Sequence, residues 1–370
     1  MGIAAKEPGR RMRIVRRAGL RIAQQGERPA TRGRAPGQPL RWRMVTAWPR
    51  RTPGPGVAAE RLAAAVTAMS GGRLRVEVVA AGEGHGPLDV LSLVGSGRAE
   101  LGHATPHYWS SREPLLDVFS GVPFGLTAEE HAGWLAYGGG QAFWTKACAP
   151  LGVVPFLAGS SGPQAGGWFR KRILRPEDFR GLKIRIAGLG AGVLKRLGAV
   201  PVMLPPGRLR SALQSGEIDA AEWVGPWNDV ALGLDSVAKL YYLPAFHELA
   251  AALELTVNVH ALASLPDDLA EIVRQAAAAA AHTTLAEFSY RNARAFPALG
   301  QRGVEVLSFP DAVVDALARE SEAALSAVAA SSALAGDTVA SLRRFRDEAA
   351  RYGRACLGRG LAMRERALIR

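Results

Sequence analysis

The feature that most constrains this chain is a regular exchange, from Leu40 onward, of short apolar strands with longer helical segments. The strand pattern RWRMVTAW leads through a turn-rich stretch to VAAERLAAAVTAMSGG, which is apolar at helical spacing, and then to the alternating LRVEVVA. Strand, helix and strand in this order are typical of a βαβ unit with a right-handed crossover. The chain is therefore predicted to be an α/β protein with mixed, mainly parallel sheets.

The same pattern restarts near residue 159, and 370 residues exceed what one small core needs, so we expect two lobes. The apolar strand LELTVNVHALA is predicted to cross back to the first lobe. A helix from Pro266 to near Ala298 is then predicted to run along both lobes as a shared spine. The predicted boundaries are residues 40–158 with 258–310 for lobe I, 159–257 for lobe II, and 311–370 for C-terminal helices.

The positive charge is concentrated at one end of the chain. The net charge is +13, and residues 1–51 hold fourteen Lys and Arg against two Glu, which leaves the remaining residues close to neutral. A nucleic-acid function would have to depend on this tail alone, so no nucleic-acid partner is expected. Residues 1–39 are predicted to be a basic arm outside the fold or a wrongly assigned start.

The tail does not have the pattern of an export signal, because no apolar run of about 7 to 15 residues follows its arginines. No segment approaches the roughly 18 consecutive apolar residues of a membrane-spanning helix. Cys148 and Cys356 are far apart and outside any metal-binding spacing, so both are interpreted as buried or incidental thiols.

The segment GLGAG at residues 188–192 follows a strand and opens a helix, as a dinucleotide fingerprint does. Val193 stands where the third glycine of that fingerprint belongs, and the next strand ends without an acidic residue for a ribose. A tight turn that brings backbone N–H groups near an anion is the preferred interpretation. An NAD(P)-dependent oxidoreductase using this turn is the alternative.

Three other places carry candidate functional side chains. Arg185 alternates with Ile184 and Ile186 in a strand, so it faces away from their buried side and is either a carboxylate-binding group or a structural ion-pair partner. Tyr108 follows a strand at the edge where α/β sheets bind ligands, or else it covers that edge. The third place is the segment AAEWVGPWND, which brings together Glu222, Trp223, Trp227, Asn228 and Asp229.

The chemistry of these groups favours a hard cation over a transition metal. Glu222 offers carboxylate oxygen and Trp223 a carbonyl, which suit Na⁺ or Ca²⁺, whereas the alternative is a solvated glutamate beside core tryptophans. The His247-Glu248 pair and Gln164 match no zinc spacing. No GxSxG elbow surrounds the serines of GSSGPQAGG, so a hydrolase triad is not expected.

Several long segments, in order, resemble the solute receptors of tripartite ATP-independent periplasmic (TRAP) transporters, in the branch that binds 2-oxoacids and related carboxylates. The likeness covers residues 40–310. It is carried by AAERLAAAVTAMSGGRLRVEVVAAGE, SGVPFGLT, YGGGQAFW, GGWFRK, GLKIRIAGLGAGVLKRLGAVPVMLP and ALQSGEIDAAEWVGPWNDVALGL.

The resemblance implies a two-lobed periplasmic-binding-protein-like fold that closes on a small carboxylate, such as pyruvate or a hydroxyacid, makes no covalent change in it, and delivers it to a membrane permease. It implies that Arg185 grips the carboxylate and that a cation bridges protein and ligand. A periplasmic location is expected, and a homodimer is left open. The predicted substrate-binding residues are Arg185, Gln164, Tyr108, Trp223 and Asn228, and the predicted cation ligands are Gln164, Glu222, the Trp223 carbonyl and Glu248.

Three features of this chain differ from the family pattern. The export signal of the family is missing from the sequence as written. Leu249-Ala250 follows Glu248 where family members commonly have Pro-Gly. The region after Pro310 matches weakly, which leaves open any dimer made through those helices.

Overall fold

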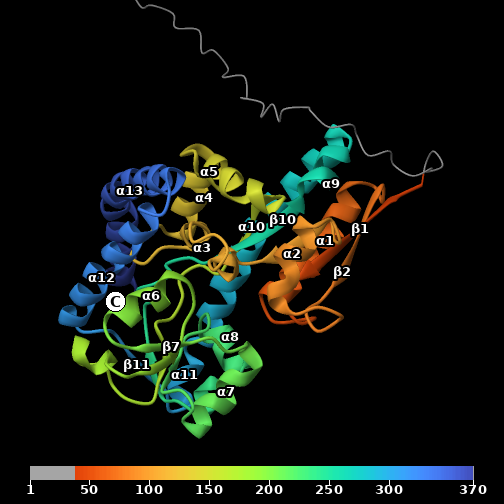
Figure 1. The fold of residues 1–370 in the computed structure, drawn as a ribbon. Coiled ribbons are helices and arrows are strands. Elements are labelled where there is room, and N and C mark those ends of the chain that lie inside the picture. Colours follow the sequence, from red (N-terminus) through yellow and green to blue (C-terminus); the bar gives the residue numbers. More distant parts are fainter. Residues whose placement is uncertain (1–37, 370) are drawn as a thin grey trace, which may run out of the picture. The chain divides into compact units, whose positions relative to one another are not determined.

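The computed structural model describes residues 38–369, and the predicted arm therefore lies, up to residue 37, outside the described residues. The chain forms two mixed sheets with helices around them (Figure 1). The first sheet has the order β2-β1-β3-β10-β4, in which β10 is antiparallel to both its neighbours. We call the part built on it the first lobe. Its strands are β1 (Leu40–Thr46), β2 (Leu74–Val79), β3 (Leu101–Ala104), β4 (Val153–Ser160) and β10 (Ala252–Asn258).

The second sheet has the order β11-β9-β5-β8-β6-β7, and the part built on it is the second lobe. Its β5 runs antiparallel to both β8 and β9, whereas β6 is parallel to β7 and β8. Its strands are β5 (Gly167–Phe169), β6 (Lys183–Arg185), β7 (Val200–Val202), β8 (Ala220–Ala221), β9 (Leu240–Tyr242) and β11 (Glu305–Leu307).

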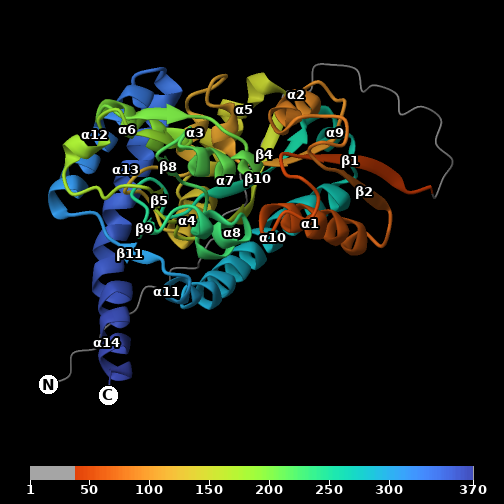
Figure 2. The ribbon, with the colours of Figure 1, turned by 90° about the horizontal axis from the view of Figure 1, so that it is seen from below.

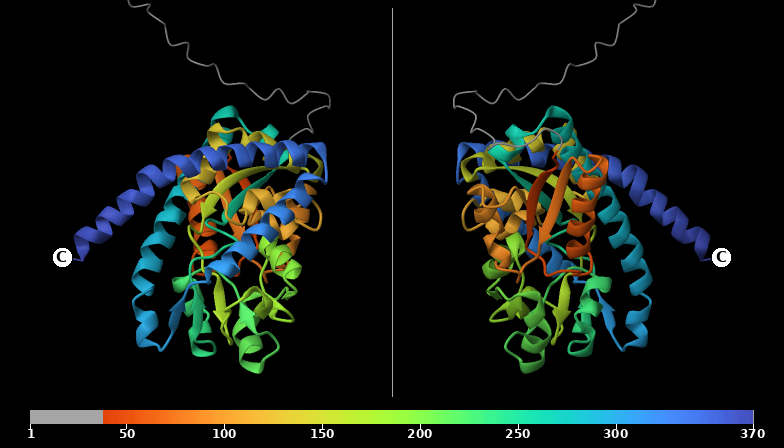
Figure 3. Two further views of the ribbon diagram at one scale, coloured as in Figure 1. Left: turned by 90° about the vertical axis from the view of Figure 1, so that its left-hand side faces the viewer. Right: turned by 90° about the vertical axis from the view of Figure 1, so that its right-hand side faces the viewer.

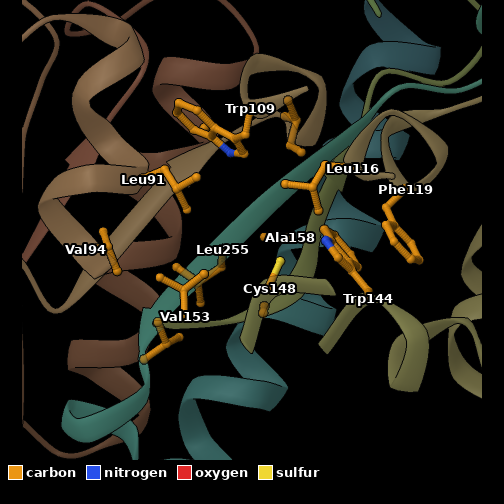
Figure 4. Packing of buried hydrophobic residues seen from close by; sticks show 14 of the residues in the cluster. Leu91, Val94, Trp109, Leu116, Phe119, Trp144, Cys148, Val153, Ala158 and Leu255 are labelled. Carbon is orange, nitrogen blue, oxygen red and sulfur yellow. The ribbon is translucent and has the colours of Figure 1, made fainter. Parts of the chain in front are cut away.

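Helices of the first lobe bury apolar side chains against its sheet (Figure 4). Phe119 stacks on Trp144 with ring centroids 5.4 Å apart, and Cys148 is a buried free thiol beside them. Thr127 caps the helix that begins at Ala128, because its side chain accepts from the Glu130 N–H. These helices are α1 (Pro55–Met69), α2 (Val90–Gly95), α3 (Leu116–Ser120), α4 (Ala128–Tyr137), α5 (Gly140–Cys148) and α9 (Val259–Ser264).

The second lobe contains three short helices, and the spine helix links both lobes. That spine, α10 (Asp267–Ala295), packs against α1 and β4 of the first lobe and against α8 of the second, as the sequence predicted. Figure 2 shows it extending from the side of α1 to the side of α11. The second-lobe helices are α6 (Gly188–Arg196), α7 (Pro206–Ser215) and α8 (Pro226–Ala231), and α11 (Ala298–Gln301) follows the spine.

The C-terminal helices connect the lobes from outside. Helix α12 (Asp311–Ala329) packs on α6, whereas α13 (Ala333–Gly353) packs on α4 and α5. A π-helical turn (Arg354–Gly358) leads to α14 (Arg359–Leu368), which buries no residue and projects from the rest of this part of the chain (Figure 3). No helix within residues 38–369 is both long enough and apolar enough to cross a membrane.

The predicted lobe boundaries differ from the sheets at two strands. Strand β10 belongs to the first sheet, as the predicted crossing of LELTVNVHALA back to the first lobe requires, but the boundary at residue 257 left most of this strand in lobe II. Strand β11 belongs to the second sheet, although residues 258–310 had been assigned to lobe I. The β11 assignment was wrong because the local apolar pattern that predicts a strand does not contain its distant pairing partner.

Two crossings between the sheets run side by side. The first is residues 161–166, between β4 and β5, and the second is residues 243–251, between β9 and β10. The Ser161 N–H donates to the Ala251 carbonyl, and the Ala251 N–H donates to Ser161 Oγ. The Ala245 N–H likewise donates to the Gln164 carbonyl. These bonds fix the backbone where the two lobes meet.

Candidate ligand-binding site

A small cavity lies where the two crossings meet both lobes, with a volume of about 60 Å³. A water molecule needs roughly 10–15 Å³ on this measure, so the cavity has room for roughly five water-sized groups. A cavity of this size can hold a very small ligand and is too small for a dinucleotide. Six of the residues that the sequence singled out line it, namely Tyr108, Gln164, Arg185, Glu222, Trp223 and Glu248.

Arg185 is the buried cation of the cavity, and its side chain is 4% exposed. It ends β6, whose other buried residue, Ile184, belongs to the core of the second lobe. Its Nη1 donates to the Glu222 carbonyl at 2.6 Å and to Glu222 Oε2 at 3.1 Å, and its guanidinium carbon lies 5.1 Å from the Trp223 ring centroid. Its Nε has no hydrogen-bond partner although it is buried. The guanidinium is therefore both an ion-pair partner and a donor with unused capacity.

Asp229, which is fully buried in α8, stabilises the turn that contains Glu222 and Trp223. One oxygen of Asp229 accepts from the N–H groups of Val224 and Gly225, each at 3.1 Å. Its other oxygen accepts from Trp168 Nε1 at 2.9 Å and from the Tyr241 hydroxyl at 3.0 Å. Burial raises the pKa of Asp229 to about 7 in spite of these donors. Asp229 is thus a positioning residue for the turn.

Gln164 and Glu248 come from the two crossings and face the same cavity. Gln164 Nε2 donates to Ser161 Oγ at 2.9 Å, which orients the amide, while its Oε1 is buried without a partner. Burial, and then the negative charge of Glu222, raise the pKa of Glu248 well above its ordinary value. Leu249-Ala250 in place of Pro-Gly has therefore not kept Glu248 out of the cavity.

The predicted cation ligands fit a hard cation on this geometry. Two buried carboxylates, Glu222 and Glu248, repel each other, and the Gln164 amide oxygen has no donor. Oxygen ligands of this kind suit Na⁺ or Ca²⁺, and a cation among them would satisfy all three groups. Within residues 38–369 no group of three or more His, Cys, Asp or Glu could hold a metal ion. The predicted set differs in kind, since an amide and a backbone carbonyl supply half of it.

The first lobe closes the cavity with aromatic and imidazole side chains. Tyr108 packs against Trp48, with ring centroids 5.8 Å apart, and both line the cavity. His107 Nδ1 lies 2.8 Å from Ser120 Oγ and 3.6 Å from Glu248 Oε1. Burial, and then the charge of Arg185, lower the pKa of His107 to about 3. The His107 ring is therefore neutral at physiological pH and adds no charge to the site.

The glycines of GLGAG serve close packing within the protein. Gly188 has φ +59°, and a Cβ there would lie 3.5 Å from the His107 Cβ. A Cβ on Gly190 would lie 2.7 Å from the His247 Cβ, closer than real Cβ contacts. The two glycines let α6 approach the cavity walls, which explains the motif without a dinucleotide.

Asn228 is the one predicted substrate-binding residue that does not line the cavity. It is 3% exposed, and its Nδ2 donates to the Pro53 carbonyl at 2.8 Å. The sequence placed it near Glu222, but α8 turns its side chain toward the loop before α1. Spacing along the chain could not reveal that direction.

The cavity residues without a predicted site role include all its other aromatic and imidazole side chains, namely Trp48, His107, His247 and Phe288. Trp48 follows the first strand at the same sheet edge as Tyr108, so the rule that ligands bind at strand ends could have found it. His247 precedes Glu248 directly, and its Nε2 lies 3.6 Å from Glu222 Oε1. Phe288 lies in the middle of α10, and nothing local distinguishes it from a core residue.

The sequence of this chain is similar to those of known extracellular solute-binding proteins. Residues 44–331 match DctP, the bacterial extracellular solute-binding protein family 7. A monocarboxylate 2-oxoacid-binding periplasmic protein of Nostoc sp. is 40% identical over 277 residues, which is 75% of this chain and 76% of that protein.

Two solved structures extend the comparison. A TRAP solute-binding protein from Pseudoalteromonas atlantica, with bound sodium and pyruvate, has 33% identity and a TM-score of 0.85, and the match covers 88% of this chain and 99% of that one. A second such protein, from Bordetella bronchiseptica, is a mixed-occupancy dimer with calcium and picolinate bound in one site. It has 30% identity and a TM-score of 0.86, and the match covers 90% of this chain and 98% of that one.

These findings confirm the predicted fold class and give the oxidoreductase alternative no support. The protein is a solute-binding receptor and not an enzyme. The chain belongs to the bacterial extracellular solute-binding protein family 7, the DctP family of TRAP transporter receptors.

Proposed function

We propose that this receptor captures a short 2-oxoacid of about the size of pyruvate, together with one Na⁺ or Ca²⁺ ion. The observation that carries the proposal is the unpaired Arg185 Nε, buried in a cavity of about 60 Å³ that also contains the unpaired Gln164 Oε1. An anion and a cation would each satisfy one of these atoms. The relatives with pyruvate or picolinate support the same chemistry.

Arg185 would donate to the ligand carboxylate while Nη1 keeps its bonds to Glu222. Charge-assisted bonds of this kind contribute about 1.5–3 kcal/mol each. A cation would supply electrostatic attraction for the carbonyl oxygen of the ligand and would be held by Gln164, Glu222, Glu248 and the Trp223 carbonyl. Tyr108 and Trp223 would exclude water and limit the length of the acid.

Ligand capture would favour the closed arrangement of the lobes, because the polar groups of the cavity come from both lobes and from both crossings. The closed receptor would deliver its ligand to a TRAP permease in the membrane, in the periplasm where its relatives work. A homodimer, which the sequence left open, has the dimeric Bordetella structure in its favour, and light scattering would measure the oligomeric state.

A thermal-shift screen of residues 38–370 tests the proposal, with pyruvate, longer 2-oxoacids and lactate, each with Na⁺, with Ca²⁺ or with chelator in potassium buffer. A ligand at about 100 times its dissociation constant adds roughly 2.7 kcal/mol to the free energy of unfolding. We expect pyruvate to raise the unfolding temperature only when one of the two cations is present. A folded protein that no acid stabilises under any cation condition would contradict the proposal.

A further inference from the structure

The loop before α1 touches α8 directly, outside the cavity. Asn228 Nδ2 in the second lobe donates to the Pro53 carbonyl in the first lobe at 2.8 Å. The two residues are 175 positions apart in sequence, and they belong to parts of the chain that are built on different sheets. Separation of the lobes must break this bond.

The spine helix completes the same contact. Phe288 of α10 is 2% exposed and packs edge to face against Trp227 of α8, with ring centroids 5.5 Å apart. It also lies against Gly54, where a Cβ would be 2.6 Å from Phe288 Cζ and 3.2 Å from Asn228 Nδ2. Only a residue without a side chain lets the loop come this close to α8 and α10.

We propose that Pro53, Gly54, Asn228 and Phe288 form a latch between the lobes, which sets how long the closed receptor retains its carboxylate. The inference rests on the proposed function, since it requires that the receptor closes on a ligand. Asn228 does not line the cavity, so its bond stabilises the closed arrangement without contacting the ligand. Pro53 is exposed, and water can satisfy both groups once the lobes part.

Phe288 also lines the cavity, but the bond from Asn228 to Pro53 does not, and this position gives the bond a signature that a ligand-contacting residue does not have. Loss of a latch bond should weaken every carboxylate by the same factor, because the bond is identical whichever acid is bound. Loss of a group that touches the ligand should instead change the preference among acids. The effect should appear as faster dissociation, since the latch forms after the ligand has entered.

Asn228→Ala tests the hydrogen bond. Calorimetry and stopped-flow dissociation would be measured with pyruvate and with 2-oxobutyrate, each with the cation found in the screen. We expect both dissociation constants to rise by one common factor of about three to ten, through faster dissociation, with an unchanged circular dichroism spectrum. Unchanged constants, or factors that differ between the two acids, would overturn the latch. A wild-type chain that binds neither acid would overturn the latch and the proposed function together.

Gly54→Ala tests the close approach independently, and Gly72→Ala is its matched control. Both glycines have a positive φ, +81° and +76°, but a Cβ on Gly72 meets nothing within 4 Å. Both variants therefore place a side chain at a positive φ, whereas only Gly54→Ala also puts its methyl group against the opposite lobe and the spine helix. We expect Gly54→Ala to lose at least tenfold in pyruvate affinity. Small-angle scattering should show that pyruvate does not reduce the radius of gyration of this variant. Equal affinities in the two variants would overturn the latch.

Discussion

Arg185 combines two roles in one side chain. Its Nη1 pairs with Glu222 inside the protein, and this pair stays buried, with both side chains about 5% exposed or less. Its Nε has no protein partner. A buried donor left unsatisfied costs about 1–3 kcal/mol, which an incoming carboxylate would recover. On the proposed function, the residue would therefore couple the stability of the site to ligand binding.

Changing Arg185 tests this coupling. We expect Arg185→Ala to weaken pyruvate binding by about 2–4 kcal/mol, because the ligand loses charge-assisted bonds and Glu222 loses its cation. Arg185→Lys keeps the charge without the planar fork and should fall between wild type and Ala. Isothermal titration of variants with native circular dichroism spectra measures the effect. A loss below about 1 kcal/mol for Ala would remove Arg185 from the site.

Glu254 is a second buried ionisable residue, in β10 away from the cavity. Trp109 Nε1 donates to its Oε1 at 2.5 Å, while its Oε2 has no partner. Burial raises the pKa of Glu254 from 4.5 to about 7. The folded chain thus holds a proton that the unfolded chain releases at lower pH. The contribution of protonated Glu254 to the free energy of unfolding is complete below pH 4.5, and it is lost as the pH rises through about 7.

Glu254→Gln should accordingly stabilise the protein more at high pH than at low pH. Glutamine can still accept from Trp109, and it carries no charge to bury. We expect the difference in free energy of unfolding from wild type to grow between pH 5 and pH 8, by about 3 kcal/mol at most. Urea unfolding across this pH range measures it. A difference that does not depend on pH would show that Glu254 titrates normally.

At the scale of elements, α6 and the second crossing meet through glycine. Gly190 of α6 faces the His247 Cβ, and His247 is followed by Glu248 in the cavity. The position of α6 therefore controls where the crossing presents its carboxylate. Gly192, two residues further along the same helix, has nothing within 4 Å of its Cβ direction.

This pair of glycines provides a matched experiment. We expect Gly190→Ala to cost roughly 1–3 kcal/mol of stability and to weaken pyruvate binding, because the new methyl group must push His247 and Glu248 aside. Gly192→Ala should stabilise α6 by up to about 1 kcal/mol and leave binding unchanged. Thermal unfolding and titration of both variants decide the point. Normal binding by Gly190→Ala would mean that the crossing can shift without cost.

At the scale of the whole molecule, the lobes are joined by three kinds of connection. The two crossings hydrogen-bond to each other, α10 packs against both lobes, and the pair α12 and α13 links α6 to α4 and α5. The cavity lies at the crossings and is lined by both lobes, so its shape depends on how the lobes meet. Helix α14 takes no part in these connections, since none of its residues is buried.

Deletion of residues 359–370 should therefore leave the ligand site intact. We expect an unchanged pyruvate dissociation constant and little change in unfolding temperature for a single protomer, because α14 contains no buried side chain whose packing would be lost. Titration and calorimetry measure both quantities. A large loss of affinity would show that α14 contributes to the site, for instance through a partner subunit.

Local sequence determined the parts that depend on local physics. Alternating apolar residues fixed most strands, helical spacing fixed α1 and the long α10, and Thr127 fixed the start of α4. Strand alternation also indicated Arg185, and local chemistry indicated Tyr108, Glu222 and Trp223 as candidates, whereas the site roles of Gln164 and Glu248 came from the family resemblance. The strands, the helices and the cap follow from side-chain periodicity and capping, which neighbouring residues decide among themselves.

The tertiary structure alone decided that β11 joins the second sheet and which side chains face one another. Strand β11 lies in the other lobe from the predicted one, Asn228 turned toward Pro53, and Phe288 reached the cavity from the spine. Each of these depends on contacts between residues far apart in the chain. Their free energy comes from packing and burial in the assembled fold, which no local pattern contains.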